Sequence, residues 1–324
     1  MKTGKLPNSL LNKIVLEPIN GHSVDRKEVL LKPSIGEDCA AVDMGDNICL
    51  LSTDPITGAV EDIGKLAIHI NTNDIASSGG EPIGIMVTAL FPPEITENEI
   101  SKTVMDLYRE AEKVNVVILG GHTEITDAVN KPVLSCTVIG KTKKLIPSGG
   151  GKIGDSVIMT KYAAMEGTAI FAHDKKEKLK NVSKSVIEKA GRLSEDISVI
   201  KEGKIGAMLG AHAMHDVTEG GILGACWEAA DCAGLGIEIY ADKIPVCEET
   251  KIICGELGVD PLRLISSGSM LIICHNGNEM IRALEDAGIK ATEIGKMTEK
   301  GKFVVENGKR YELEEPGSDE LYRV

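Results

Sequence analysis

The chain has 324 residues, a length that favours two domains over one, and 42% of its residues are hydrophobic, enough to build a full core. Aromatic residues contribute only 3%, so the core must consist of aliphatic side chains, as in layered α/β domains. The formal net charge of −13 argues against a nucleic-acid-binding surface and against contact with an anionic membrane.

The cysteine pattern and the amino terminus predict a cytoplasmic protein. The eight cysteines are scattered and form no Cys-x-x-Cys pair, so zinc-ribbon and thioredoxin-type spacings are absent. The amino terminus lacks the apolar core of a signal peptide, and no run approaches the roughly 18 apolar residues of a transmembrane helix. We therefore expect a chain with reduced thiols that has no membrane segment.

The amino-terminal part is predicted to be an arm, residues 1–34, followed by a compact α+β domain, residues 35–146. Apolar runs bounded by turn residues predict strands at 38–44, 47–53, 83–90, 115–119 and 133–140. Helical periodicity predicts helices at 9–17, at 61–78 and from the capping box Thr96-x-x-Glu99 onward. The last of these helices presents Ile100, Val104, Leu107 and Ala111 on one face.

A glycine-rich segment, residues 147–151, separates this domain from the second one, which begins there and runs to residue 324. Three glycines could cradle a phosphate, but the Lys-Ser/Thr of a P-loop is missing, so a flexible linker is favoured. Strands are expected at 155–160, up to 215–216, and at 236–240, 269–274 and 303–306. Helices are expected at 163–172, 183–200, 218–232, 248–257 and 277–287.

Asp74 stands where the helical pattern calls for a core residue. Ile63, Ala67 and Ile70 follow one apolar stripe, and Asp74 is the next position on it. A buried acid costs several kcal/mol unless it is paired or bound to a cation. Hard oxygen ligands suit Mg²⁺, which usually arrives with phosphates, so Asp74 indicates a nucleotide-phosphate site. The alternative is an ion pair between Asp74 and a lysine.

Two more aspartates lie at strand ends close to Asp74 in sequence. Asp38 lies at the edge of a strand after Gly36, and Asp54 ends the next strand. A hairpin that brings both beside the helix of Asp74 would create a metal-binding carboxylate cluster; otherwise both are ordinary turn acids. Asn73, next to Asp74, either binds a ligand or satisfies buried backbone groups.

Two glycine motifs also come after strands. In the first, Gly120 and Gly121 would let a backbone approach a ligand, and His122 and Glu124 offer acid–base groups around Thr123; the alternative is an exposed strand-to-loop turn.

In the second motif, a strand ends at Asp216, and Gly220 and Gly221 open a helix whose amides can bind an anion; the alternative is a simple cap by Thr218. His212 and His215 are not expected to share zinc, because a three-residue offset on a strand points to opposite faces.

Taken in order, these motifs resemble the ATP-dependent AIR synthase-related superfamily. That superfamily contains aminoimidazole ribonucleotide synthetase, thiamine-monophosphate kinase, selenophosphate synthetase and the hydrogenase maturation factor that makes thiocyanate. The likeness rests on Gly36-Glu37-Asp38, Ser52-Thr53-Asp54, Asn73-Asp74-Ile75-Ala76, Gly120-Gly121-His122-Thr123-Glu124 and Asp216-Val217-Thr218-Glu219-Gly220-Gly221. The chain is most similar to the branch of the hydrogenase expression/formation protein E, through Gly4-Lys5-Leu6-Pro7 and residues 318–323.

The resemblance implies an α+β fold with an N-terminal α/β half-barrel that dimerises and a C-terminal α/β sandwich. It implies ATP and Mg²⁺, with Asp38, Asp54 and Asp74 as metal ligands. The remaining positions implied at the nucleotide are Asn73, Gly120, Gly121, Thr123, Asp216, Gly220 and Gly221. His122 or Glu124 would contact a small-molecule acceptor that receives a phosphoryl group.

The sequence also departs from its branch. The maturation factor ends in a cysteine that carries the carbamoyl group, whereas this chain ends Tyr322-Arg323-Val324, and its last cysteine is Cys274. Selenophosphate synthetase needs a cysteine or selenocysteine in an N-terminal glycine-rich segment, but the first cysteine here is Cys39. We expect a Mg²⁺-ATP-dependent enzyme with a small acceptor. The alternatives are a non-catalytic ATP-binding partner in a maturation complex, or hydrogenase maturation with the thiol supplied in trans.

Overall fold

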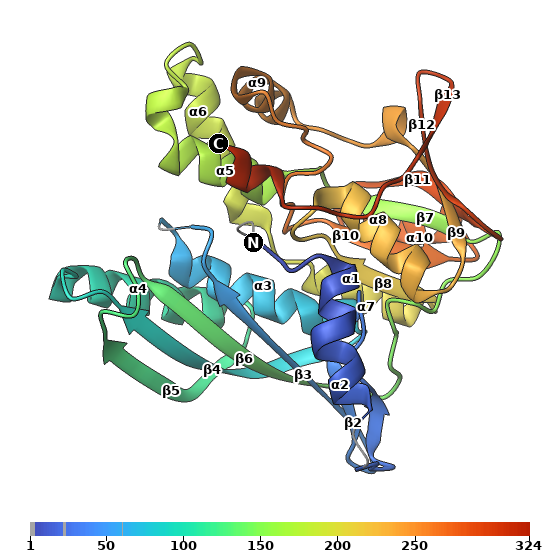
Figure 1. Cartoon of the computed structure of the whole chain (residues 1–324), viewed down its shortest axis with the longest axis horizontal. Coiled ribbons are helices and arrows are strands. Elements are labelled where there is room, and N and C mark those ends of the chain that lie inside the picture. The colour runs from blue at the N-terminus through green and yellow to red at the C-terminus, as the bar shows by residue number, and fades with distance from the viewer. Residues whose placement is uncertain (1–3, 22–23, 60) are drawn as a thin grey trace.

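The computed structural model in Figure 1 describes residues 4–21, 24–59 and 61–324, so part of the expected arm, residues 1–3 and 22–23, lies outside the described residues. Two halves, each built on a sheet, lie side by side, as the predicted α+β fold requires. The first sheet is open, with the strand order β1-β2-β3-β6-β4-β5. Its strands are β1 (Val29–Leu31), β2 (Ala40–Asp43), β3 (Ile48–Ile56), β4 (Glu81–Phe91), β5 (Val117–Ile125) and β6 (Val133–Thr142).

Helices α3 (Ile63–Ser77) and α4 (Glu97–Lys113) cover one face of this sheet (Figure 1). The predicted capping box at the start of α4 is present, because the Thr96 hydroxyl accepts from the Glu99 N–H and the Glu99 carboxylate accepts from the Thr96 N–H. Leu107 is buried as predicted, but Val104 is 47% exposed. Ile83 and Met86 of β4 are exposed, and the register shifts of this strand lie near them.

Strand β5 is longer than predicted and contains the two glycines that were expected to follow the strand and approach a ligand. Gly121 has φ +151°, and a Cβ at this position would lie 1.8 Å from the carbonyl oxygen of Val87 on β4. Only glycine allows this approach, so the glycine serves the pairing of the two strands. Strand β5 runs parallel to β4 and forms an edge of the sheet.

The second sheet forms the middle layer of the predicted α/β sandwich. Its order is β13-β12-β9-β11-β7-β10-β8. The strands are β7 (Ser156–Thr160), β8 (Ala213–Asp216), β9 (Gly236–Tyr240), β10 (Met270–Cys274), β11 (Ala291–Thr298), β12 (Lys302–Glu306) and β13 (Lys309–Glu312). On β7, Val157 and Met159 pack with α8 (Gly221–Cys232), while Ile158 packs with α7 (Ile200–Met208) and α10 (Gly277–Asp286).

The remaining helices lie beside the two sheets. Helices α5 (Met165–Asp174), α6 (Lys184–Gly191) and α9 (Glu248–Leu257) contact one another, and Phe171 and Ile253 continue the core of the first half. The arm carries α1 (Asn8–Leu11), a π-helical segment (Asn12–Leu16) and α2 (Glu17–Asn20). Short 3₁₀ segments cover Lys176–Lys178, Arg192–Asp196, Ala241–Lys243 and Glu320–Arg323.

The single helix predicted over 183–200 is wrong, because the chain leaves helical geometry between α6 and α7. Polar side chains bind the backbone of this stretch. The Lys161 ammonium group donates to the carbonyls of Asp196 and Ser198, and Asn73 binds Ile197 and Val199. Strands β1, β11 and β13 were not predicted; in β11 a register shift between Glu293 and Gly295 interrupts the alternation that would have indicated a strand.

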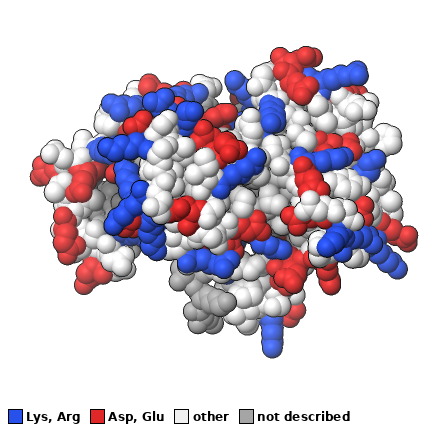
Figure 2. Space-filling model, turned by 90° about the horizontal axis from the view of Figure 1, so that it is seen from above, with Lys and Arg blue, Asp and Glu red and all other residues white. Residues whose placement is uncertain are grey.

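The surface in Figure 2 carries basic and acidic side chains of both signs interspersed over the same face. Within the described residues, no helix combines the length and the apolar character that crossing a bilayer requires.

Candidate functional site

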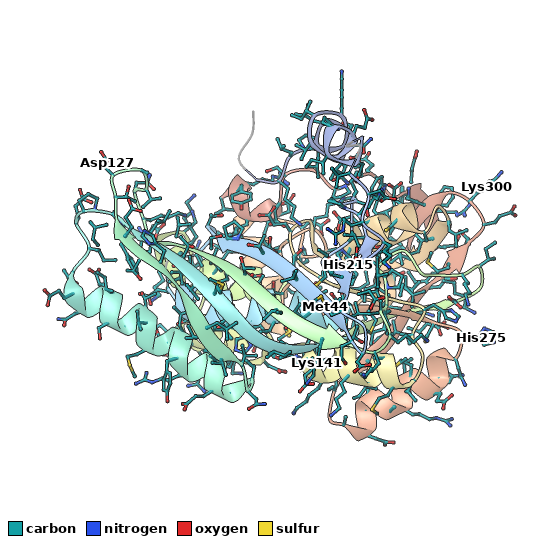
Figure 3. All side chains as sticks on the ribbon, turned by 90° about the horizontal axis from the view of Figure 1, so that it is seen from below. Met44, Asp127, Lys141, His215, His275 and Lys300 are labelled. Atoms are coloured by element: carbon teal, nitrogen blue, oxygen red, sulfur yellow. The ribbon has the colours of Figure 1, made fainter. Side chains whose placement is uncertain are left out.

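A cavity of 410 Å³ lies where the two halves meet, and Figure 3 labels His215 in this region. Its walls come from the loop before β2, from β3, from α3, and from the second half at β8 and α8. The charged side chains among its lining residues are Lys5, Lys32, Glu37, Asp38, Asp54, Asp74, His215, Asp216 and Glu228. The hairpin β2–β3 therefore brings the predicted aspartates together with Asp74.

Asp74 is only 4% exposed on α3, a helix that is buried on nearly all sides. The Ser52 hydroxyl donates to its carboxylate at 2.5 Å. Burial, and next Asp216, Asp54 and Asp38, raise the pKa of Asp74 well above its ordinary value. No lysine or arginine of the described residues forms an ion pair with it, so the ion-pair alternative is not what the structure contains.

Asp216 ends β8 and is 2% exposed. One of its carboxylate oxygens is buried and has no hydrogen-bond partner within the described part of the chain. Burial is the main reason that its pKa rises to about 8, with a further contribution from Asp38. A buried, unpartnered carboxylate oxygen beside other acids is a natural cation ligand, so this donor set fits Mg²⁺.

Asp38 is held by two donors from different halves of the molecule. The Ser77 hydroxyl donates to its carboxylate at 2.8 Å, and the His215 Nδ1 lies 2.9 Å from it. The other ring nitrogen of His215 lies 3.1 Å from Glu228 on α8. Burial opposes a charge on His215, but Asp38 and Glu228 outweigh it, and the pKa rises well above the usual value. His215 is thus an imidazolium bridge.

His215 and Glu228 are site residues that sequence reasoning missed. His215 was weighed with His212 as a zinc pair, and the two side chains bind different acids, His212 binding Asp155 and His215 binding Asp38. Its position directly before Asp216 was the available signal. Glu228 carries no such signal, because it lies in the middle of a helix and reaches the cavity only through the packing of α8.

The arm contributes a cation at the cavity mouth. Lys5 is among the residues that line the cavity. Desolvation lowers the pKa of Lys5, but Glu228, Glu219, Asp54 and Asp38 raise it above the ordinary value. The Asp54 pKa is raised, chiefly by burial, while Lys5 opposes the rise. The cavity therefore keeps an excess of acids over cations.

Other predicted residues lie elsewhere. The motif Gly120-Gly121-His122-Thr123-Glu124 is exposed on edge strand β5, outside the lining of the cavity, and His122 lies 3.2 Å from Glu124. Asn73 is fully buried, and its side-chain amide binds both the Ile197 carbonyl, at 2.8 Å, and the Val199 N–H, at 2.9 Å. Of the two readings left open for Asn73, the structure shows the satisfaction of buried backbone.

The amide of Gly220, directly before α8, already binds a carboxylate. The Gly220 N–H donates to Asp319 at 2.6 Å, and the same carboxylate accepts from Leu321 and Ile265. The Gly221 N–H donates to the Thr218 carbonyl. Burial raises the pKa of Asp319 to about 6. The anion that the sequence predicted at this helix start is thus, in the structure, a side chain of the carboxyl-terminal tail.

Comparison with known proteins places these features in context. The sequence matches the models for "AIR synthase related protein", N-terminal domain, over residues 36–142 and C-terminal domain over 152–307. It is 27% identical over 318 residues to a Methanocaldococcus jannaschii protein named for hydrogenase expression and formation, covering 93% of this chain and 90% of that protein.

Two solved structures share the fold. HypE in a HypE–HypF complex has a TM-score of 0.77 at 20% identity, over 94% of this chain and 100% of that chain. Thiamine-monophosphate kinase ThiL from Aquifex aeolicus, complexed with AMPPCP and TMP, has a TM-score of 0.75 at 22% identity, over 95% and 97% of the two chains.

Proposed function

Since the chain belongs to the AIR synthase related family, we propose that it is a Mg²⁺-ATP-dependent enzyme that activates a small acceptor by phosphoryl transfer. The observation that carries the proposal is the group of acids Asp38, Asp54, Asp74 and Asp216 on one cavity between the halves. Burial raises the pKa of Asp74 and Asp216, and an oxygen of Asp216 has no partner within the described residues. A cation would compensate these acids.

Asp38, Asp54 and Asp74 would hold Mg²⁺, with Asp216 beside them. Bound there, the metal would neutralise phosphate charge on ATP. His215 fixes the Asp38 carboxylate from the second half, so both halves contribute to its orientation. Lys5 offers a further positive charge at the mouth of the cavity, where phosphate oxygens would arrive. In the reaction, an acceptor oxygen gains the γ-phosphoryl group and ADP leaves.

We also propose a homodimer formed through β5. This strand is an edge whose residues are exposed throughout, and Val117, Leu119 and Ile125 are each more than half exposed. Exposed apolar edge strands favour pairing with another strand. Joining two open sheets along β5 would form a barrel. It would also place Gly120, Gly121, His122, Thr123 and Glu124 at the interface, where His122 or Glu124 would meet the partner's acceptor.

The proposal is tested by phosphate release from Mg²⁺-ATP in the presence of a metabolite panel. One compound should stimulate release by the wild type, and Asp74→Asn should lower the stimulated rate at least about 100-fold because a metal ligand is lost. Asp127→Asn is the matched control, since Asp127 lies exposed at the far end of the first half in Figure 3. Equal rates for wild type and Asp74→Asn would refute the proposal.

A second candidate is a non-catalytic ATP-binding partner in a maturation complex. The HypE–HypF complex is one assembly of a relative with this fold. The Val324 carbonyl accepts from Lys175, and the Tyr322 hydroxyl donates to Glu219, so the last described residues are docked against the second half. Tight Mg²⁺-ATP binding without turnover by any panel compound would favour this candidate.

A further inference from the structure

A second, smaller cavity opens beside the acidic one, between the two ends of the chain. Its volume is 170 Å³, and it shares Lys5 and Glu228 with the larger cavity. The arm supplies Leu6, Pro7, Asn8 and Leu10, and the tail supplies Pro316, Gly317 and Ser318; Glu219 completes the wall. A molecule held there would therefore lie directly next to the site proposed for phosphoryl transfer.

The arm and the tail are joined at this cavity by Glu219. The backbone N–H of Lys5 donates to one of its carboxylate oxygens at 3.3 Å, and the Tyr322 hydroxyl donates to the other at 2.8 Å. A Cβ at Gly4 would lie 3.2 Å from the Tyr322 ring, which shows how closely the two segments pack. Asp319 fastens the tail to the start of α8. The cavity wall is thus a fixed assembly of distant segments.

The chemistry of the wall defines what fits. Leu6, Pro7, Leu10 and Pro316 provide an apolar body, and Glu219 and Glu228 provide hydrogen-bond acceptors. Asn8 lines the cavity, and its side-chain nitrogen is buried without a hydrogen-bond partner among the described residues, so a rotation of this side chain would turn an unused donor toward the cavity. A buried donor without a partner is costly, and a ligand oxygen would satisfy it.

Size and charge narrow the ligand further. A cavity of about 150 Å³ is enough to hold benzene, so this one takes a molecule of roughly six to ten non-hydrogen atoms. Three acids, Glu219, Glu228 and the nearby Asp319, outnumber Lys5 and the His215 ring that binds Glu228, so the surroundings of the cavity disfavour an anionic group. The wall therefore selects a neutral or positively charged molecule with an apolar body. That molecule carries an oxygen acceptor or N–H donors, and it places no phosphate or carboxylate group inside the cavity.

We propose that the cavity between arm and tail is the acceptor pocket, and that it takes a small neutral or cationic molecule and rejects anions. This inference rests on the proposed function and adds the acceptor class to it. The segments that build the pocket, Gly4–Leu10 and Pro316–Ser318, lie at opposite ends of the sequence. The acceptor is then enclosed by the chain's two termini, and its oxygen faces the acidic cavity through the boundary at Lys5 and Glu228.

The test uses four probes of similar size, with about eight to ten non-hydrogen atoms each, on the full chain: benzamide, benzylamine, benzoate and benzenesulfonate. Binding is measured by ligand-observed NMR with Mg²⁺ and AMPPCP present, and AMPPCP affinity is measured separately by calorimetry. Benzamide and benzylamine should bind at least about 10-fold more tightly than the two anions. Leu10→Trp, which fills the pocket, should abolish probe binding, whereas Ile14→Trp on the exposed side of the same arm should not.

The two proposals fail separately. Loss of AMPPCP binding in the wild type would count against the proposed function. If the wild type binds AMPPCP, three outcomes would overturn the acceptor pocket alone. They are equal affinity for anionic and cationic probes, no binding of any probe, and probe binding that Leu10→Trp leaves unchanged. Leu10→Trp must retain AMPPCP affinity within about 2-fold of wild type, which shows that the variant is folded. If Leu10→Trp loses AMPPCP affinity, Asn8→Ala replaces it. Asn8→Ala should weaken benzamide binding more than benzylamine binding, because only benzamide offers an oxygen to the Asn8 nitrogen. An equal effect on both probes would overturn the pocket.

Discussion

The imidazole of His215 connects to Glu228 at 3.1 Å and, through its other nitrogen, to Asp38 at 2.9 Å. His215→Gln removes the positive charge between two nearly buried carboxylates. We expect the free energy of unfolding at pH 7 to fall by about 3 kcal/mol, because breaking a buried ion pair leaves an uncompensated charge. Urea denaturation measures it, with His275→Gln, an exposed histidine in Figure 3, as the control.

The double variant His215→Gln with Glu228→Gln should recover part of that loss, since it also removes one of the two stranded charges. Equal instability of the single and double variants would show that the loss comes from packing and not from charge.

Asp74→Asn should have opposite effects on stability and on ligand response. Without metal at pH 8, the variant should unfold at higher urea than wild type, because it removes a buried acid crowded by Asp216, Asp54 and Asp38. Saturation with Mg²⁺-ATP at about 100 times Kd should stabilise wild type by about 2.7 kcal/mol and the variant far less. Thermal melts with and without Mg²⁺-ATP decide this, and equal ligand-induced shifts would contradict the metal role.

Glu166→Gln should change the pH dependence of stability. Burial raises the pKa of Glu166 to about 7 from an ordinary 4.5; the Ser267 hydrogen bonds oppose the rise, and Asp319 and Glu219 add to it. Between these values the folded chain holds a proton that the unfolded chain has released. The free energy of unfolding therefore declines as pH rises from about 4.5 to about 7 and is level above that range.

The glutamine variant lacks this decline, so at pH 8 it should be more stable than wild type by up to about 3 kcal/mol, and at pH 4.5 nearly equal to it. Denaturation curves at pH 5, 6, 7 and 8 would show the divergence. The control is Glu285→Gln on the exposed side of α10. Its free energy of unfolding and that of wild type should change with pH in parallel. A constant difference at every pH for Glu166→Gln would contradict the assignment.

Asn73→Ala should loosen the contact between α3 and the segment before α7. It leaves the Ile197 carbonyl and the Val199 N–H without their partner in a buried environment. We expect a loss of about 2–4 kcal/mol in the free energy of unfolding. Asn98→Ala on the exposed surface of α4 should instead be neutral or slightly stabilising, because alanine favours helix. A loss below about 1 kcal/mol for Asn73→Ala would contradict the inference that Asn73 holds α3 against the segment before α7.

Val117→Glu should convert the proposed dimer into a monomer, because a charge on the edge strand opposes pairing. Light scattering coupled to size exclusion measures the mass. Val104→Glu is the matched control, because Val104 is 47% exposed on α4 and does not belong to the edge strand. A wild type that is monomeric at micromolar concentration, or a dimer that survives Val117→Glu, would contradict pairing through β5.

The cluster of acids could be predicted from the sequence because it depends on local pattern. Asp74 interrupts a helical stripe, and Asp38 and Asp54 flank a hairpin, so their convergence follows from short connections. The roles of His215, Glu228 and Lys5 depend on how the second half and the arm dock against the first. No local periodicity encodes that docking, so sequence alone did not reveal these residues.

Two kinds of strand explain most of the differences in fold: β1, β5 and β13 lie at sheet edges, and the interior strand β11 contains a register shift. The glycines of β5 indicate a turn by local rules, yet the parallel neighbour β4 makes glycine necessary inside the strand. Strand β11 has an interrupted alternation, and its pairing with β7 and β9 supplies what the pattern lacks. Central strands with long apolar runs, such as β7 and β10, were predicted correctly because burial on both faces leaves a clear signal.

The strand order of the second sheet also determines how much of the chain must be synthesised before that sheet can form. Strand β10 lies between β7 and β8, although it follows both in sequence. Synthesis must therefore pass residue 274 before these three strands can pair, whereas the strands of the first sheet are complete by residue 142. Nascent chains shorter than this expose the unpaired edges of β7 and β8, and during this interval chaperone protection matters most.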